Sequence, residues 1–275
     1  MARAEGDDIV VALWQDVREI VHEQRQYRDL LFQMVKRDLV LRYKQTFMGA
    51  AWAVFMPLVN TIIFTFIFTR IARVNVGIPY PVFAFSGLVA WNLFASSLRF
   101  SIVSLTSNIS LVTKVYFPRE IFPVSAILVC LVDFTIANGV LLLVMLFYGM
   151  MPSSAVIYLP AVLLVHLTFT TGVSLFVAMA NLFYRDVKYL FEVMLTAWMF
   201  ATSVLYPVSL IGGRAGQLLQ LNPMTPIIEG YRGVMVTGQH PFTPWFGLSA
   251  AVSLVILVSA WIMFHRAEYS FAERV

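Results

Sequence analysis

Few residues of this chain have the types and spacing that chemistry needs. The four histidines, at positions 22, 166, 240 and 265, are scattered, and the one cysteine, Cys130, lies within an apolar stretch. The chain contains no G-x-x-x-x-G-K-[S/T], G-x-S-x-G or H-E-x-x-H motif, the patterns that bind nucleotide phosphates, place a serine nucleophile or bind zinc. We therefore predict no catalytic residue, no metal site and no cofactor of its own. If the chain performs active transport, its ATPase is a separate chain.

Polar residues inside the apolar stretches are the next candidates. Asp133 is the clearest, Asn138 follows one to two turns later, and Arg99 and Glu192 lie nearer the ends of their stretches. A charge at membrane depth is costly and suggests a functional site by default. A proton pathway, however, normally uses a relay of such groups, and this sequence shows none. We therefore favour a structural role, with Arg99 and Asp133 pairing between adjacent spans.

A third set of charges, Lys114, Arg119 and Glu120, lies in a short loop between two apolar stretches. So short a loop has little room for chemistry of its own, but it is the right size for a handle that another protein can push. Phe117-Pro118 stiffens the exit from this loop, because proline fixes its backbone and suits the first turn of the next helix. We expect Arg119 and Glu120 to reach the side chains of that other protein.

The composition shows what must position these residues. The chain is 60% hydrophobic and only 12% charged, about half the charged fraction of a soluble domain. Most of its surface must therefore face lipid, where backbone groups have to pair within each segment, so we predict an all-α integral membrane protein. Six apolar segments reach or approach the roughly 20 residues of a transmembrane helix. They are 49–69, 82–105, 121–150, 155–183, 189–211 and 245–264.

The basic residues predict the orientation of these spans. With a cytoplasmic N-terminus, only Arg70, Arg73, Arg214 and Arg232 fall in outer loops, and most other basic residues fall on the cytoplasmic side. Basic residues hold loops in the cytoplasm, so we expect both termini there. The same rule explains the net charge of +4 without a nucleic-acid partner. We also expect no cleavable signal peptide, since no apolar run follows the first few residues.

Residues 1–48 are predicted to form cytoplasmic or interfacial helices, and residues 49–275 the transmembrane domain. Helices are expected over 8–26 and 27–44. In the second, apolar and polar residues segregate to opposite faces, which is typical of a helix lying in the membrane interface or of an ordinary helix packed on protein. The apolar face comprises Leu30, Leu31, Met34, Val35 and Leu41, and the polar face Asp29, Gln33, Lys36, Arg37 and Lys44. Asp38 and Arg42 interrupt the apolar face at i,i+4 spacing and can pair.

The largest outer link, 206–244, is rich in glycine and proline. Within it, Thr225 is a good N-cap and Pro226 suits the first helical position. Glu229 and Arg232 stand at i,i+3 spacing and can pair. The segment is too apolar for a solvated loop and too short for a span, so we predict re-entrant helices buried by protein.

Three motifs carry a resemblance to a known family. They are Lys114-Val-Tyr-Phe-Pro-Arg-Glu-Ile-Phe-Pro123, Leu182-Phe-Tyr-Arg-Asp-Val-Lys188 and Leu221-Asn-Pro-Met-Thr-Pro-Ile-Ile-Glu-Gly-Tyr-Arg232. Together with the basic N-terminal region and six spans, the chain resembles the permease subunits of type-two ABC exporters. Within these it most resembles the permeases that export O-antigen, teichoic acid or capsular glycans.

The resemblance implies a homodimeric pore in the bacterial inner membrane, driven by two copies of a separate ATPase that binds ATP and Mg²⁺. The substrate would be a glycan on a polyprenyl-diphosphate carrier. From residue chemistry alone, aromatic side chains could line a pore for sugar rings, and Arg28, Lys36 and Arg37 could steer the diphosphate, although control of topology explains these basic residues too. Three groups of site residues follow from the resemblance. The coupling loop, 107–120, would contact the ATPase through Leu111, Val112, Thr113, Lys114, Val115, Tyr116, Phe117, Pro118, Arg119 and Glu120. The interfacial helix would contribute Arg28, Lys36, Arg37, Asp38 and Arg42. The outer gate, 206–244, would contribute Asn222, Pro223, Pro226, Glu229, Tyr231 and Arg232.

Other functions remain open on the sequence. An exporter of the same architecture could carry a smaller lipid or a drug. A membrane-embedded enzyme acting on lipid-linked sugars would need clustered carboxylates or a metal site, whereas Asp133, Asp186, Glu192 and Glu229 are scattered. A channel or secondary transporter is disfavoured because the two halves share no broken-helix pattern.

Overall fold

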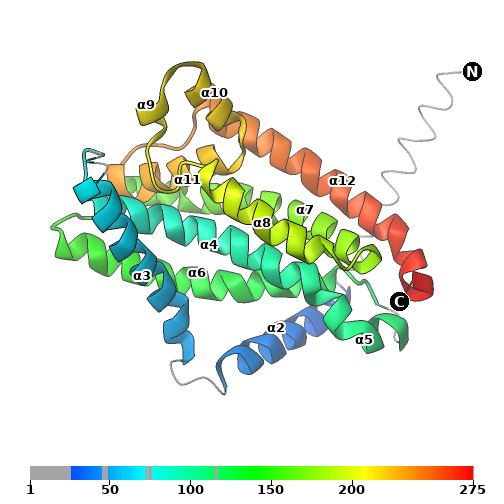
Figure 1. Cartoon of the computed structure of the whole chain (residues 1–275). Helices are drawn as coiled ribbons and strands as arrows, with labels where there is room; N and C mark the ends of the chain where they lie inside the picture. Colours follow the sequence, from blue (N-terminus) through cyan, green and yellow to red (C-terminus); the bar gives the residue numbers. More distant parts are fainter. Residues whose placement is uncertain (1–25, 45–48, 72, 74–75, 115–116, 275) are drawn as a thin grey trace, which may run out of the picture.

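The computed structural model describes residues 26–44, 49–71, 73, 76–114 and 117–274 (Figure 1). Long helices dominate this part of the chain and lie side by side as a bundle. The bundle is built mainly from α4 (Tyr80–Ser104), α6 (Ile121–Phe147), α7 (Leu159–Phe183) and α12 (Pro244–Arg274). The prediction of an all-α membrane protein is therefore confirmed.

Five helices in the described part of the chain are long and apolar enough to cross a membrane. Four belong to the bundle, and the fifth runs from Val54 to Ile71, combining most of α3 (Trp52–Phe66) with a final π-helical turn. Such helices satisfy their own backbone hydrogen bonds, which a lipid environment requires.

The predicted span 189–211 does not form one continuous helix, so that prediction is wrong. Helix α8 (Val187–Phe200) has 14 residues and rises only about 21 Å, less than the roughly 30 Å of the hydrocarbon core. The chain then bends, and Pro207 begins the short α9 (Val208–Ile211). Hydropathy stays high through this bend, which is why the sequence pattern missed the break.

Helix α4 forms the centre of the bundle. It packs against α3, α6, α7, α8 and α11 (Met224–Arg232), and nearly all of its residues are buried. At the α7–α12 contact, a Cβ at Gly172 would lie 2.8 Å from the backbone nitrogen of Leu257. A small residue there lets the two backbones approach closely, as in other membrane helix pairs.

The two ends of the bundle carry different short elements. At one end lie α5 (Ile109–Lys114) and the end of α12; at the other lie α9, α10 (Gly213–Leu221) and α11 (Figure 1). Helix α2 (Arg28–Tyr43) packs on α6. The predicted coupling loop and outer link thus lie at opposite ends.

The predicted face division of 27–44 is only partly right. Met34 is buried, but Leu41, assigned to the apolar face, is 71% exposed, and Arg37 from the polar face is half-buried against protein. The helix expected over 8–26 lies outside the described residues.

Candidate functional site

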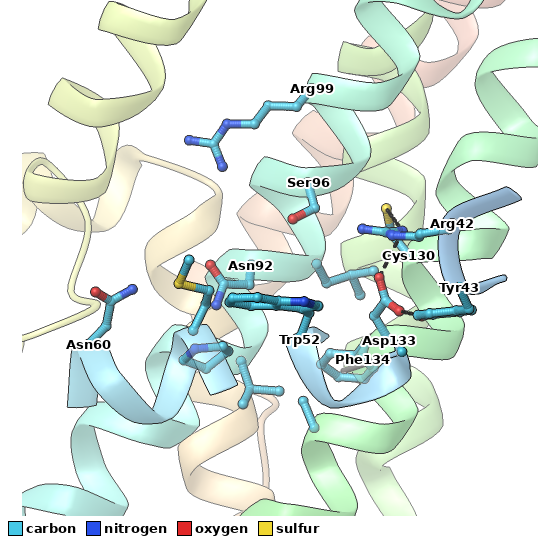
Figure 2. A pocket seen from close by; sticks show the side chains of 16 residues that line it. Arg42, Tyr43, Trp52, Asn60, Asn92, Ser96, Arg99, Cys130, Asp133 and Phe134 are labelled. Atoms are coloured by element: carbon cyan, nitrogen blue, oxygen red, sulfur yellow. Dashed lines mark hydrogen bonds and ion pairs between the residues drawn. The ribbon is translucent and has the colours of Figure 1, made fainter. Parts of the chain in front are cut away.

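A cavity of about 400 Å³ opens between α2, α3, α4 and α6 (Figure 2). Polar side chains from several elements line it: Arg42, Tyr43, Asn60, Asn92, Ser96 and Asp133. Asn92, Ser96 and Arg99 stand one above another along α4, and the Trp52 ring extends across the cavity below them. Their spacing of four and three residues places these three on one face of the helix.

Asp133 is neutralised by α2. Its Oδ2 lies 2.8 Å from Nη1 of Arg42, and its Oδ1 accepts a hydrogen bond from the Tyr43 hydroxyl. Burial and the neighbouring Asp133 carboxylate raise the pKa of Tyr43, so this hydroxyl remains a donor at neutral pH. The predicted Arg99–Asp133 and Asp38–Arg42 pairs are both wrong, because α2 packs on α6 and presents Arg42 to Asp133.

Arg99 pairs instead with Glu192 of α8, at 3.0 Å. Both side chains are about half exposed, although they belong to apolar helices. Asn138 has a local role, since its side-chain amide donates to the carbonyl of Phe134 one turn earlier. Arg99 and Asp133 therefore line the same cavity with different ion-pair partners, whereas Asn138 is not among the residues that line it.

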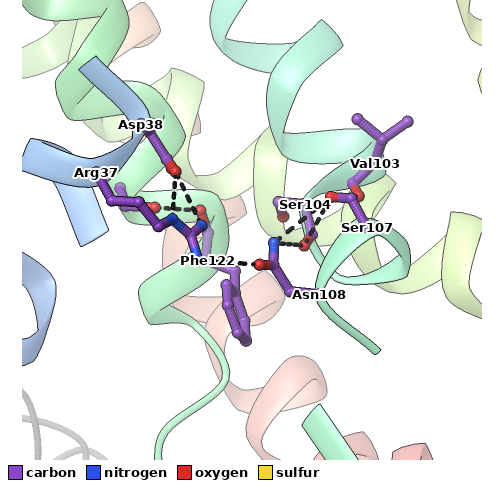
Figure 3. A network of polar contacts seen from close by, with 8 residues as sticks. Arg37, Asp38, Val103, Ser104, Ser107, Asn108 and Phe122 are labelled. Carbon is purple, nitrogen blue, oxygen red and sulfur yellow. Dashed lines mark hydrogen bonds and ion pairs between the residues drawn. The ribbon is translucent and has the colours of Figure 1, made fainter. Parts of the chain in front are cut away.

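A polar network ties α2 to the start of the coupling loop (Figure 3). Arg37 pairs with Asp38 at 2.8 Å and donates to Oδ1 of Asn108 at 3.2 Å, while the Asn108 amide donates to the carbonyl of Ser104. A second cavity, of about 520 Å³, lies between these residues and α6. Arg28 and Lys36, by contrast, are exposed.

The coupling loop is exposed along much of α5 and turns inward after it. Val112, Phe117, Pro118 and Glu120 are buried, whereas Thr113 and Lys114 are exposed. Leu111 is half-buried, and Val115 and Tyr116 lie outside the described residues. Phe117 packs edge-on against Phe122, with ring centroids 5.5 Å apart.

Arg119 clamps this loop to α12. Its guanidinium donates to the carbonyls of Val112 and Glu268, and its Nη1 lies 3.3 Å from the Glu268 carboxylate. The Arg119 backbone N–H also donates to that carboxylate, at 3.0 Å. The prediction that Arg119 and Glu120 reach a partner's side chains is wrong, because both face this intramolecular contact.

Sequence reasoning missed the other half of this clamp. The last span was expected to end at 264, yet α12 continues to Arg274 and places His265 and Glu268 beside the loop. The available signal was the i,i+3 spacing of these two residues, which puts both on one helical face.

At the opposite end, Arg232 clamps the predicted outer gate. Its buried guanidinium donates to the carbonyls of Ser203 and Val204, lies 3.7 Å from the Phe83 ring centroid and pairs with Glu229 at 2.9 Å. The predicted Glu229–Arg232 pair is confirmed. Gly87 of α4 makes room for it, since a Cβ there would lie 2.4 Å from Arg232 Nη2.

Asn222 organises the start of α11. Its Oδ1 accepts from the backbone N–H of Met224 and from the Trp198 indole, and its amide donates to Thr202 Oγ1. Asn222 therefore fixes the turn that leads into the helix. The predicted N-cap at Thr225 is wrong, because the helix begins at Met224 with Pro223 in the N-cap position.

The remaining gate residues are also inward. The Pro223 carbonyl accepts from the hydroxyl of Ser249 on α12, and Pro226 is buried. The Tyr231 hydroxyl lies 3.2 Å from Nδ1 of His166 on α7. Pro226, Tyr231 and Arg232 are thus buried in the bundle, whereas the Glu229 side chain is 40% exposed.

Comparison with known proteins places this arrangement in a family. Residues 29–236 match the family described as ABC-2 type transporter. The chain is 33% identical to an O-antigen export system permease protein, RfbA, of Myxococcus xanthus over 258 residues, which cover 93% of this chain and 99% of the relative. Two proteins of the same name from Klebsiella pneumoniae are 29% and 27% identical over 246 residues, 89% of this chain and 94% of each relative.

The family match covers most of the chain, and the relatives align with it over nearly their whole length. These names describe transport subunits and not catalytic enzymes. The chain therefore belongs to the ABC-2 type transporter family, as a permease of the polysaccharide export group.

Proposed function

We propose that two copies of this chain form the pore of an ATP-driven exporter for a lipid-linked, O-antigen-like polysaccharide. Two copies of a separate ATPase, which bind ATP and Mg²⁺, would power it from the cytoplasmic side of the bacterial inner membrane. The names of the relatives support the polysaccharide class. In this proposal α8 and the bend after it complete the sixth crossing, which leaves both termini in the cytoplasm.

One observation on α4 carries the proposal. From Val82 to Phe100 every residue of this central helix is buried except Asn92, Ser96, Arg99 and Phe100. Three of these four are polar and share a face, and the Arg99–Glu192 pair on it is half exposed. Charges facing hydrocarbon are costly, and membrane proteins turn them toward water or other protein. The face of α4 that carries Asn92, Ser96 and Arg99 would therefore line a wet pathway closed by the second copy.

Aromatic residues at this face suit a glycan. Trp52 extends across the cavity, and Phe100 lies beneath the Arg42 guanidinium at 4.4 Å from its ring centroid. Aromatic faces can stack on the apolar C–H faces of sugars without holding them by many hydrogen bonds. The exposed Arg28 and Lys36 would steer the lipid diphosphate, since Lys and Arg bind phosphate through charge-assisted hydrogen bonds.

The remaining elements divide the mechanical roles. Thr113 and Lys114, the exposed end of α5, would contact the ATPase, while Arg119 and Glu120 hold that segment to the bundle. Helices α10 and α11 would form the outer gate. The ATPase contact at α5 and the outer gate at α10 and α11 then lie at opposite ends of the same bundle.

The test is a bulky substitution on the proposed pathway. S96W should block ATP-dependent export of the lipid-linked glycan from vesicles holding the permease and its ATPase, while the two proteins still co-purify. L164W is the matched control, because Leu164 is an exposed apolar residue on α7, away from this face. Equal export by S96W and L164W would contradict the proposal.

A further inference from the structure

Three potential metal ligands converge where the coupling loop meets α12. Glu120 precedes α6, while His265 and Glu268 stand one turn apart on α12, and one ligand atom from each lies within 4.8 Å of the other two. Nδ1 of His265 is 3.8 Å from Glu120 Oε1 and 3.9 Å from Glu268 Oε2. These residues come from segments about 145 positions apart, so the fold itself assembles the cluster.

The carboxylates in this cluster are unequally compensated. Arg119 faces Oε1 of Glu268, through its backbone N–H and Nη1. Glu120 is 1% exposed, and its Oε2 has no hydrogen-bond partner among the described residues. A buried carboxylate oxygen without a hydrogen-bond partner is costly, and buried charges are normally paired or coordinate a metal. The position of Glu120 therefore points to a cation at this junction.

The donor set selects the kind of cation. Imidazole nitrogen and carboxylate oxygen both bind Zn²⁺ in proteins, and zinc sites with three protein ligands keep a fourth position for water. Zinc bonds of about 2.1 Å place tetrahedral ligands roughly 3.4 Å apart, so the ligand atoms, now within 4.8 Å of one another, would have to approach by about 1 Å to close the site.

We propose that Glu120, His265 and Glu268 bind a divalent transition metal, with Zn²⁺ the best match. The metal would join the end of the coupling loop to α12 beside the Arg119 clamp, and Arg119 would hold the Glu268 carboxylate in place as its outer partner. Hydrogen-bonded partners of this kind orient metal ligands. This structural site is independent of whether the transported substrate is a glycan.

The test measures metal content on the full-length permease, purified in detergent with its affinity tag removed. After equilibration with Zn²⁺ and removal of free metal, inductively coupled plasma mass spectrometry should find one zinc ion per chain. E120Q and H265A should each lose it, whereas H240A, which removes an exposed histidine from the outer link, should retain it. X-ray absorption on the wild type should show nitrogen and oxygen ligands and no sulfur.

Thermal unfolding separates metal loss from misfolding. Zn²⁺ should raise the Tm of the wild type and of H240A. It should leave the Tm of E120Q unchanged, in a sample that is shown to be folded by its normal elution in size-exclusion chromatography. Wild-type protein without bound zinc, or H265A with undiminished zinc, would overturn the proposal. So would a Tm that responds to pH but not to Zn²⁺, which would assign the compensating charge to protonated His265.

Discussion

Two arginines at opposite ends of the bundle, Arg119 and Arg232, are used in similar ways but within different surroundings. Each guanidinium donates to backbone carbonyls and pairs with one glutamate. Arg232 is 3% exposed and joins α11 to α4 and to the bend after α8. Arg119 joins a short loop to the end of one long helix, beside two carboxylates and a histidine.

We propose that this difference separates a clamp that only stabilises the fold, at Arg232, from one that transmits motion, at Arg119. The partners of Arg232 belong to elements that are packed together through the core, so removal of its side chain should loosen the end of the bundle that carries α10 and α11. The partners of Arg119 link the exposed Lys114 end of α5 to α12, which spans the bundle from one end to the other. A push on α5 therefore has a direct route to the end where α10 and α11 lie.

The largest effect is expected from R232M. Loss of the guanidinium leaves the Ser203 and Val204 carbonyls without these donors, at a cost on the order of 3 kcal/mol in the free energy of unfolding. We expect little folded protein and a clearly lower Tm in detergent. R232K keeps the charge but not the planar guanidinium, so its Tm should lie between those of R232M and the wild type. If R232M had the same Tm as the wild type, Arg232 would not stabilise the fold as this comparison of the two clamps requires.

The next effect concerns the space around Arg232. In G87A the new methyl group would lie 2.4 Å from Arg232 Nη2 and 2.5 Å from the Val204 carbonyl, and overpacking of this kind costs about 1–3 kcal/mol. G139A is the matched control on α6, where a Cβ meets nothing within 4 Å and helix propensity favours alanine by about 0.5–1 kcal/mol. Thermal unfolding should show opposite signs for the two variants. The same sign in both would contradict this account of Gly87.

A smaller effect on stability, confined to one pair of residues, should appear at the Arg119 clamp. R119M and E268Q should each lower the free energy of unfolding, by about 1–3 kcal/mol, because hydrogen bonds to charged groups are lost. The double variant should cost less than the sum of the two, since they share one interaction. Additive costs, measured by a double-mutant cycle in detergent, would show that Arg119 and Glu268 do not stabilise each other.

The smallest change in stability is expected for K114E. Lys114 is exposed at the end of α5, so the free energy of unfolding should shift by no more than about 0.5 kcal/mol. Association with the ATPase should nevertheless weaken, and the loss should depend on salt as expected for an exposed charge. Co-purification across a salt series measures this, with R185E as the control, because Arg185 is exposed in the turn that precedes α8. Equal loss in both variants would argue against a specific contact at α5.

The sequence predicted the helical class, the positions of most spans and the Glu229–Arg232 pair, because hydropathy and i,i+3 spacing are local properties. It failed where partners come from distant segments. The sequence pairs Asp133 with Arg99 because the two residues lie on adjacent spans, whereas in the structure α2 packs on α6 and its Arg42 pairs with Asp133.

The coupling loop shows the same limit more sharply. Arg119 and Glu120 read as surface charges in a polar loop, and only the continuation of α12 past residue 264 turns them inward. The break after Phe200 was missed for a different reason, since the residues that follow keep the apolar composition of a span. An apolar composition predicts that a segment lies in lipid, but it does not predict where a helix ends.

The central claim is that the Arg119 clamp transmits motion from α5 to α12. Its most direct test is the amount of glycan exported per ATP hydrolysed, in vesicles that contain the permease and its ATPase, for R119Q against the wild type. We predict that R119Q still assembles and hydrolyses ATP, while export per ATP falls about tenfold, a loss of about 1.4 kcal/mol in coupling. An unchanged ratio in a properly assembled R119Q complex would contradict the claim.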